Sequence, residues 1–155
     1  MTDPELNEPN LNQPDFNQPD FNVTMLLCDH VTVAEGKLFI NGGGWTLTGP
    51  NPTPMGIALV IGVPWSSAGS DVRFRLALVM TDGQPVAAPS GGAPIAIEGN
   101  VHVNSPEGMS PGAHLDVPLA INFPPLELPS GQRLIWELEL NDSRHADWRL
   151  PFHTR

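Results

Sequence analysis

Cys28, Asp29 and His30 are the residues whose types and spacing come nearest to a nucleophilic site. A cysteine nucleophile needs a histidine beside it and a third group that orients that histidine. In a strand, side chains two residues apart share a face, so Cys28 and His30 would lie together while Asp29 opposes them. Free cysteine is also among the most often buried residue types, which favours a structural thiol at a strand end. We therefore expect no catalytic residues.

The histidines do not have the spacing of a metal site. They are His30, His102, His114, His145 and His153, and no two are separated as paired ligands on a strand or a helix would be. His145 shares a loop with Asp142 and Asp147, where a weak cation site is the alternative to a solvated polar turn. We expect neither a metal ion nor another cofactor.

The glycine run at residues 42–44 is followed by Trp45, and not by the Lys and Ser or Thr of a phosphate-binding loop. It predicts backbone with positive φ or a close approach of a neighbour, and the alternative is a glycine-lined groove beside Trp45. Trp136 and Trp148 are in phase with leucines and are expected in the core. Trp45 and Trp65 are candidate binding residues, because an exposed tryptophan often anchors a partner.

Residues 1–22 form an acidic tail with a period of five: Pro, an acid or Asn, Leu or Phe, Asn, then Gln or Glu. The recurring prolines exclude a helix. One interpretation is a disordered, solubilising leader. The other is a docking strip whose apolar side chains enter a partner's groove. The candidate binding residues of this strip are Leu6, Leu11, Phe16 and Phe21.

The charge balance limits the possible partners. Seventeen acidic residues against seven Lys and Arg give a formal net charge of -10, which repels nucleic acid and anionic membrane surfaces. No apolar stretch approaches the ~20 residues that span a bilayer, and the polar start does not resemble a secretory signal. The single cysteine excludes an internal disulfide and is compatible with the cytoplasm, where we expect the protein.

The elements that must position these residues are short strands. Eighteen Pro and fifteen Gly in 155 residues disfavour long helices, and the length fits one domain with an appendage. From residue 23 onward apolar and polar side chains alternate, most clearly over residues 71–80. The pattern predicts an all-β fold: an antiparallel two-sheet β-sandwich of about eight or nine strands over residues 23–155, behind an extended N-terminal tail.

Two details of this sandwich follow from residue order. Residues 134–140 and 148–152 are expected to form a hairpin with a loop at residues 141–147, because Leu and Glu alternate from Trp136 to Leu140. Pro118 and Pro151 interrupt strands, so both strands are expected at sheet edges, where a missing donor costs no ladder bond.

Several segments carry a resemblance to a known family. They are residues 25–45, which include Cys-Asp-His and Gly-Gly-Gly-Trp, and Val-Pro-Trp at 63–65, Asn-Phe-Pro-Pro at 122–125 and Asp-Trp-Arg-Leu-Pro-Phe at 147–152. Residues from about 23 to 155 resemble a family of small bacterial proteins, common in actinobacteria, whose function is unknown. The resemblance implies a compact β-rich domain from a bacterium or a bacteriophage, and no activity comes with it.

By elimination, we expect a non-enzymatic binding or assembly module. One version is an accessory or decoration-like subunit of a larger bacterial or phage complex, docked through its tail onto a protein partner or a further copy of itself. The alternative is a small-ligand or carbohydrate-binding sandwich that uses the loop tryptophans. A Cys28–His30 enzyme is the third hypothesis.

Overall fold

The computed structural model describes residues 21–155, which fold into strands joined by turns. The strands are β1 (Asn22–Cys28), β2 (His30–Ala34), β3 (Lys37–Asn41), β4 (Leu47–Thr48), β5 (Met55–Val63), β6 (Asp71–Met80), β7 (Ala96–His102), β8 (Leu115–Phe123), β9 (Arg133–Leu140) and β10 (Ser143–Thr154). A single 3-10 turn, η1 (Trp65–Ser67), follows β5 in the part described. The all-β prediction is confirmed. No helix in residues 21–155 is long and apolar enough to cross a bilayer.

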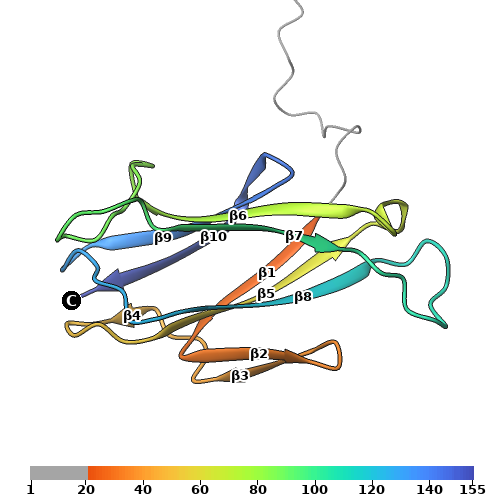
Figure 1. Cartoon of the computed structure of the whole chain (residues 1–155), viewed down its shortest axis with the longest axis horizontal. Helices are drawn as coiled ribbons and strands as arrows, with labels where there is room; N and C mark the ends of the chain where they lie inside the picture. The colour runs from red at the N-terminus through yellow and green to blue at the C-terminus, as the bar shows by residue number, and fades with distance from the viewer. Residues whose placement is uncertain (1–20) are drawn as a thin grey trace, which may run out of the picture.

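The strands form two facing sheets and one separate hairpin. The smaller sheet has the order β1-β5-β8, and the larger has the order β4-β10-β9-β6-β7. All the pairings are antiparallel except that of β4 with β10. The hairpin β2–β3 packs against β5 and β8 on the side away from the larger sheet (Figure 1). The predicted two-sheet sandwich therefore has eight strands in its two sheets, and the hairpin adds two more strands as a short third layer.

The core fills the space between the two sheets, where the apolar side of each strand's alternation faces inward. Leu76, Leu78 and Leu138 are fully buried, as is Trp136. The Trp136 Nε1 donates to Met55 Sδ at 3.3 Å, and its ring stacks on Phe123 with centroids 4.8 Å apart. Each large side chain buried this way contributes roughly 1.5–3 kcal/mol.

The outer face of the larger sheet carries the polar half of that alternation. Arg144 Nε lies 2.7 Å from Glu139 Oε1, and Arg149 Nε lies 3.5 Å from Glu137 Oε2. Such cross-strand pairs on a solvated face contribute little to stability. They show why Leu and Glu alternate in β9: the glutamates are on the outer face and the leucines are in the core.

The β9–β10 connection is shorter than the sequence indicated. Asn141 and Asp142 both have positive φ, at 49° and 64°, and form a two-residue hairpin turn. Asn and Asp tolerate this left-handed backbone, which matches the twist of the flanking strands. The predicted loop at residues 141–147 is therefore wrong. β10 begins at Ser143. Its pairing with β9 is interrupted by a register shift between Arg144 and Arg149.

The predicted edge position is confirmed for one of the two strand prolines and is wrong for the other. Pro118 lies on β8, an edge strand, as expected. Pro151 lies on β10, between β4 and β9, so that prediction is wrong. The N–H of His153 donates to Thr46 on the β4 side, and the vacant donor position of Pro151, two residues earlier, faces the same way. Because β4 pairs only with His153 and Thr154, the proline removes no ladder bond.

Candidate binding site

Cys28 lies in a small second core between the smaller sheet and the β2–β3 hairpin, with Val31 and Ala58. The space around its thiol is filled: a Cβ added to Gly56 would lie 2.8 Å from Cys28 Sγ. Burial, and then the nearby Asp29 carboxylate, raises the pKa of the Cys28 thiol. The side chain of His30 is exposed. This placement favours the structural interpretation over the nucleophilic one, because the reactive form of cysteine is the thiolate.

One amide side chain forms hydrogen bonds between the smaller sheet and the hairpin. Asn122 Oδ1 accepts the Val31 N–H at 3.0 Å, and Asn122 Nδ2 donates to the Val31 carbonyl at 2.7 Å. The side chain thus pairs with a backbone as a neighbouring strand would. Small residues on the same face, Gly56, Ala58 and Ala120, let the hairpin approach closely.

The glycine run has the backbone role that the sequence predicts. Gly42 and Gly44 have φ of 60° and 91°. A Cβ on Gly43 would lie 2.9 Å from Ile40 Cγ2 and 3.1 Å from Leu26 Cδ2. The run therefore turns the chain away from the hairpin and lets it pass close to these two side chains.

A group of exposed apolar side chains, which we call the hairpin surface, lies on β2–β3 and the end of β1. It contains four of the six exposed large hydrophobic residues within residues 21–155: Leu26 (37% exposed), Val33 (41%), Phe39 (54%) and Ile40 (39%). Phe39 pairs with Thr32 on the outer face of the hairpin, whereas Ile40 pairs with the buried Val31, so Ile40 and Val33 lie at the rim of the opposite face, which meets the smaller sheet. This surface was not predicted from the sequence. The signal was the run Leu38-Phe39-Ile40, since consecutive strand residues cannot all face one core.

The sequence-based binding residues are placed differently from one another. Leu6, Leu11 and Phe16 lie outside the described residues. Phe21 is 8% exposed and packs edge-on against Trp148, with ring centroids 6.2 Å apart.

The two candidate tryptophans are partly buried against the main core. Trp45 meets Phe152 edge-on at 6.3 Å, and its Nε1 is buried without a hydrogen-bond partner among the residues described. Trp65 is in η1. Phe21, Trp45 and Trp65 therefore contribute contacts within the fold.

The His145 region does not gather a cation site. His145 Nδ1 lies 3.5 Å from Asp147 Oδ2 and accepts the Asp147 N–H, whereas Asp142 pairs with Arg73. Within residues 21–155, no three His, Cys, Asp or Glu side chains are placed to hold a metal ion. His145 and Asp147 instead line a wide polar hollow of about 380 Å³, with His114 and the start of β1.

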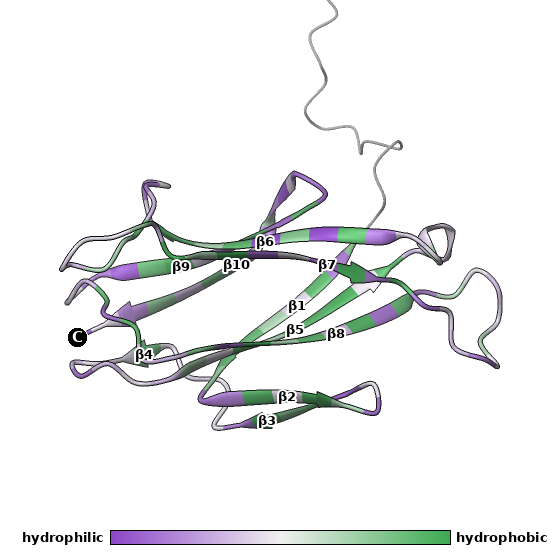
Figure 2. Ribbon diagram, in the orientation of Figure 1, coloured by the Kyte–Doolittle hydropathy of each residue, from purple (hydrophilic) through white to green (hydrophobic). Residues whose placement is uncertain are grey.

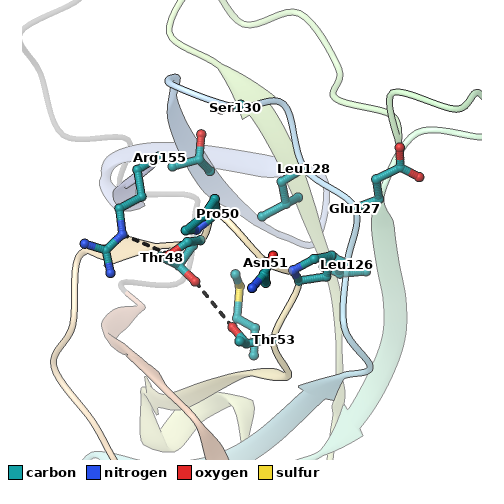
Figure 3. Close-up of a pocket in the computed structure, with 13 residues that line it drawn as sticks. Thr48, Pro50, Asn51, Thr53, Leu126, Glu127, Leu128, Ser130 and Arg155 are labelled. Atoms are coloured by element: carbon teal, nitrogen blue, oxygen red, sulfur yellow. Dashed lines mark hydrogen bonds between the residues drawn. The ribbon is translucent and has the colours of Figure 1, made fainter.

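A second hollow, the end pocket, lies beside β4 and the C-terminal end of β10 (Figure 3). It measures about 170 Å³. Its apolar lining is Pro50, Pro52, Met55, Leu126 and Leu128, and its polar lining includes Thr48, Asn51, Thr53, Glu127, Ser130 and Arg155. Arg155 Nε donates to the Gly49 carbonyl at 2.9 Å, and the hydroxyls of Thr48 and Thr53 lie 3.4 Å apart. An apolar floor with donors and acceptors around it is the usual composition of a recognition pocket.

The fold and these surfaces define a class: an all-β sandwich with an added hairpin layer and a pocket at one end. The chain belongs to DUF6941, a family of unknown function that matches residues 23–153. The expected membership of an uncharacterised family is confirmed. No curated protein and no solved structure matches the chain.

Proposed function

We propose that the protein is a non-enzymatic binding module, an accessory subunit that joins a larger assembly by holding a protein partner on the hairpin surface. The observation that carries the proposal is the exposure of Phe39 on the outer face of the hairpin, with Leu26, Val33 and Ile40 exposed along the rim of its other face. Scattered surface hydrophobics need no explanation, but a group of them on one element is typical of an interaction site.

The chemistry of the hairpin surface indicates the kind of partner. Figure 2 shows hydrophobic segments on both β2 and β3. The acidic and basic side chains of the hairpin are Glu35, in its turn, and Lys37, at the start of β3. Phe39 is more than half exposed, so it can serve as an aromatic anchor in a partner's pocket. A protein surface presenting aliphatic or aromatic side chains is the complementary partner.

Small-ligand binding is the second candidate function, at the end pocket and not at the tryptophans. The packing of Trp45 and Trp65 against the core gives a tryptophan-based sugar site little support. The composition of the end pocket, an apolar floor with a polar rim, favours a ligand, but its volume of about 170 Å³ is below that of pockets for drug-sized ligands. Tryptophan fluorescence or calorimetry against a ligand panel would test this second candidate.

The test of the first candidate uses two exposed apolar residues of similar exposure. Phe39 is 54% exposed on β3, and Leu47 is 50% exposed on β4, at another part of the molecule. Phe39→Ser and Leu47→Ser remove comparable amounts of apolar surface. We expect a partner that co-purifies with the wild type to be kept by Leu47→Ser and lost by Phe39→Ser, with a fall in affinity of about tenfold or more.

Binding of the purified partner is then measured for all three proteins by calorimetry, with thermal unfolding as the check that each is folded. Equal binding by Phe39→Ser and Leu47→Ser would show that the hairpin surface does not hold the partner.

A further inference from the structure

We propose that the end pocket binds the N-terminal tail of a second copy of this chain, with Phe16 on the apolar floor and Asp15 beside Arg155. The hairpin surface plays no part in this contact, so the two proposals stand or fall separately. The occupant is a named segment, residues 1–20, which lies outside the described part of the chain.

The size of the end pocket suits one side chain of a peptide better than a whole ligand. Pockets for drug-sized ligands measure about 300–1,000 Å³. The end pocket measures about 170 Å³, and its floor is formed by Met55, Leu126 and Leu128. A single aromatic side chain inserted there would be an anchor of the kind that dominates protein–protein interfaces. In the tail, the large apolar side chains are at the third position of each repeat, and Phe16 is the aromatic one among residues 1–20.

The polar rim matches the residues on either side of Phe16. Residues 1–20 contain five acids and no basic residue. Arg155 uses Nε on the Gly49 carbonyl, which leaves the other guanidinium N–H groups for a carboxylate such as Asp15. Hydroxyls of Thr48, Thr53 and Ser130 can pair with the Asn and Gln amides of the repeat.

The one acidic side chain in the lining does not oppose this arrangement. Glu127 accepts the Ser90 hydroxyl at 2.7 Å, and Figure 3 shows its carboxylate pointing away from Arg155. An acidic peptide entering on the Arg155 side would therefore lie beside the guanidinium and away from the Glu127 carboxylate.

Chain length favours a contact with a second molecule. The described chain starts at Phe21, which packs on Trp148 in the middle of β10, and the pocket lies at the C-terminal end of β10 with Thr154 and Arg155. Six residues of strand from Trp148 to Thr154 span about 20 Å. Five residues of fully extended chain, from Phe21 back to Phe16, reach at most ~17 Å. Phe16 would thus reach its own pocket only with a fully extended chain running straight along β10, whereas the pocket of a neighbour requires no such path.

A tail on one copy and a pocket on the next make a head-to-tail contact. Contacts of this type are heterologous, and they grow into chains or rings when each copy supplies both halves. The purified protein should therefore self-associate in steps as its concentration rises.

The experiment separates the two halves of the contact in full-length chains. Phe16→Ser removes the anchor, and Asn17→Ser is its control in the tail. Ser130→Trp obstructs the pocket from an exposed rim position, and Ser110→Trp places the same side chain at an exposed serine outside the pocket. Sedimentation velocity measures association, and thermal unfolding confirms that every variant is folded.

We expect the wild type and both controls to self-associate, and Phe16→Ser and Ser130→Trp each to weaken association at least about tenfold. A mixture of these two variants should form one-to-one dimers and nothing larger, because only one intact tail and one intact pocket remain per pair. Three results would overturn the proposal: a wild type that stays monomeric up to about 1 mM, a Phe16→Ser protein that associates normally, or a mixture that does not dimerise.

A charge exchange tests the pairing of Asp15 with Arg155. Arg155→Glu should weaken association by about two- to fivefold, the range of an exposed ion pair. Adding Asp15→Arg to that chain should restore it. If the double variant is weaker than Arg155→Glu alone, the pairing is wrong.

Discussion

At the scale of single residues, Cys28 illustrates how position decides chemistry. The sequence Cys28-Asp29-His30 contains the residue types of a nucleophilic site, but the thiol lies under the hairpin in contact with Gly56. Burial is the larger cause of its raised pKa, and the charge of Asp29 is the next. Both effects favour the neutral thiol, which is the less reactive form.

We expect iodoacetamide to label Cys28 slowly in the native protein at about pH 8, and rapidly once guanidinium has unfolded it. The measurement is mass spectrometry of a labelling time course. Fast native labelling would instead indicate an accessible thiolate and would revive the enzyme hypothesis.

The same thiol should make the free energy of unfolding decrease at alkaline pH. Its folded pKa lies above the ordinary value of 9.0, so its contribution is complete below that value and is lost as the pH rises through the folded pKa. Urea unfolding of the wild type and of Cys28→Ala at increasing pH measures this loss. The wild type should lose more stability above pH 9.0 than Cys28→Ala, and parallel losses would mean that the thiol does not contribute.

At the scale of elements, the packing of β2–β3 against the smaller sheet holds the hairpin surface in one position. The hairpin buries only a small core against that sheet, and Asn122 pairs with both backbone groups of Val31. Its close approach depends on Gly56, whose missing side chain leaves room for Cys28, Asn122 and the backbone of His30.

Gly56→Ala should destabilise the fold by about 1–3 kcal/mol, because the added methyl overpacks this contact. Gly62→Ala is the matched control, since Gly62 is on the same face of β5 but outside the hairpin contact, with Asn22 and Asp116 as its neighbours. Its effect should stay within about 1 kcal/mol. Hydrogen exchange should show faster exchange of the β2–β3 amides in Gly56→Ala. Equal exchange in the two variants would contradict the packing argument.

At the scale of the whole molecule, the boundary between tail and domain falls slightly before the residue at which the alternation starts. Asn22 pairs with Gly62 at the start of β1, and Phe21 belongs to the main core. The last apolar residue of the five-residue repeat is therefore part of the folded domain.

Removing residues 1–20 should leave the free energy of unfolding unchanged, whereas removing residues 1–22 should lower it by roughly 1.5–3 kcal/mol, the value of one buried large side chain. Chemical denaturation of the two truncated chains measures the difference. Equal stability would show that Phe21 adds nothing to the core.

The sequence alone determined the fold class and most of the strands, because side-chain alternation with a period of two is a local property of a strand that has one buried face. Residues 71–80 and residues 115–123, whose alternation it recognised, are β6 and β8. It also indicated the backbone role of Gly42–Gly44, because that role depends on local φ angles.

The tertiary structure decided where the possible sites are. Which exposed side chains gather, and which segments enclose a hollow, depend on strand order and on loops that are distant in sequence. Phe39 is exposed because its hairpin forms a third layer, and the end pocket brings residues 48–55, 126–130 and 154–155 together. Contacts between such distant segments leave no periodic trace in the chain, so only the folded arrangement reveals them.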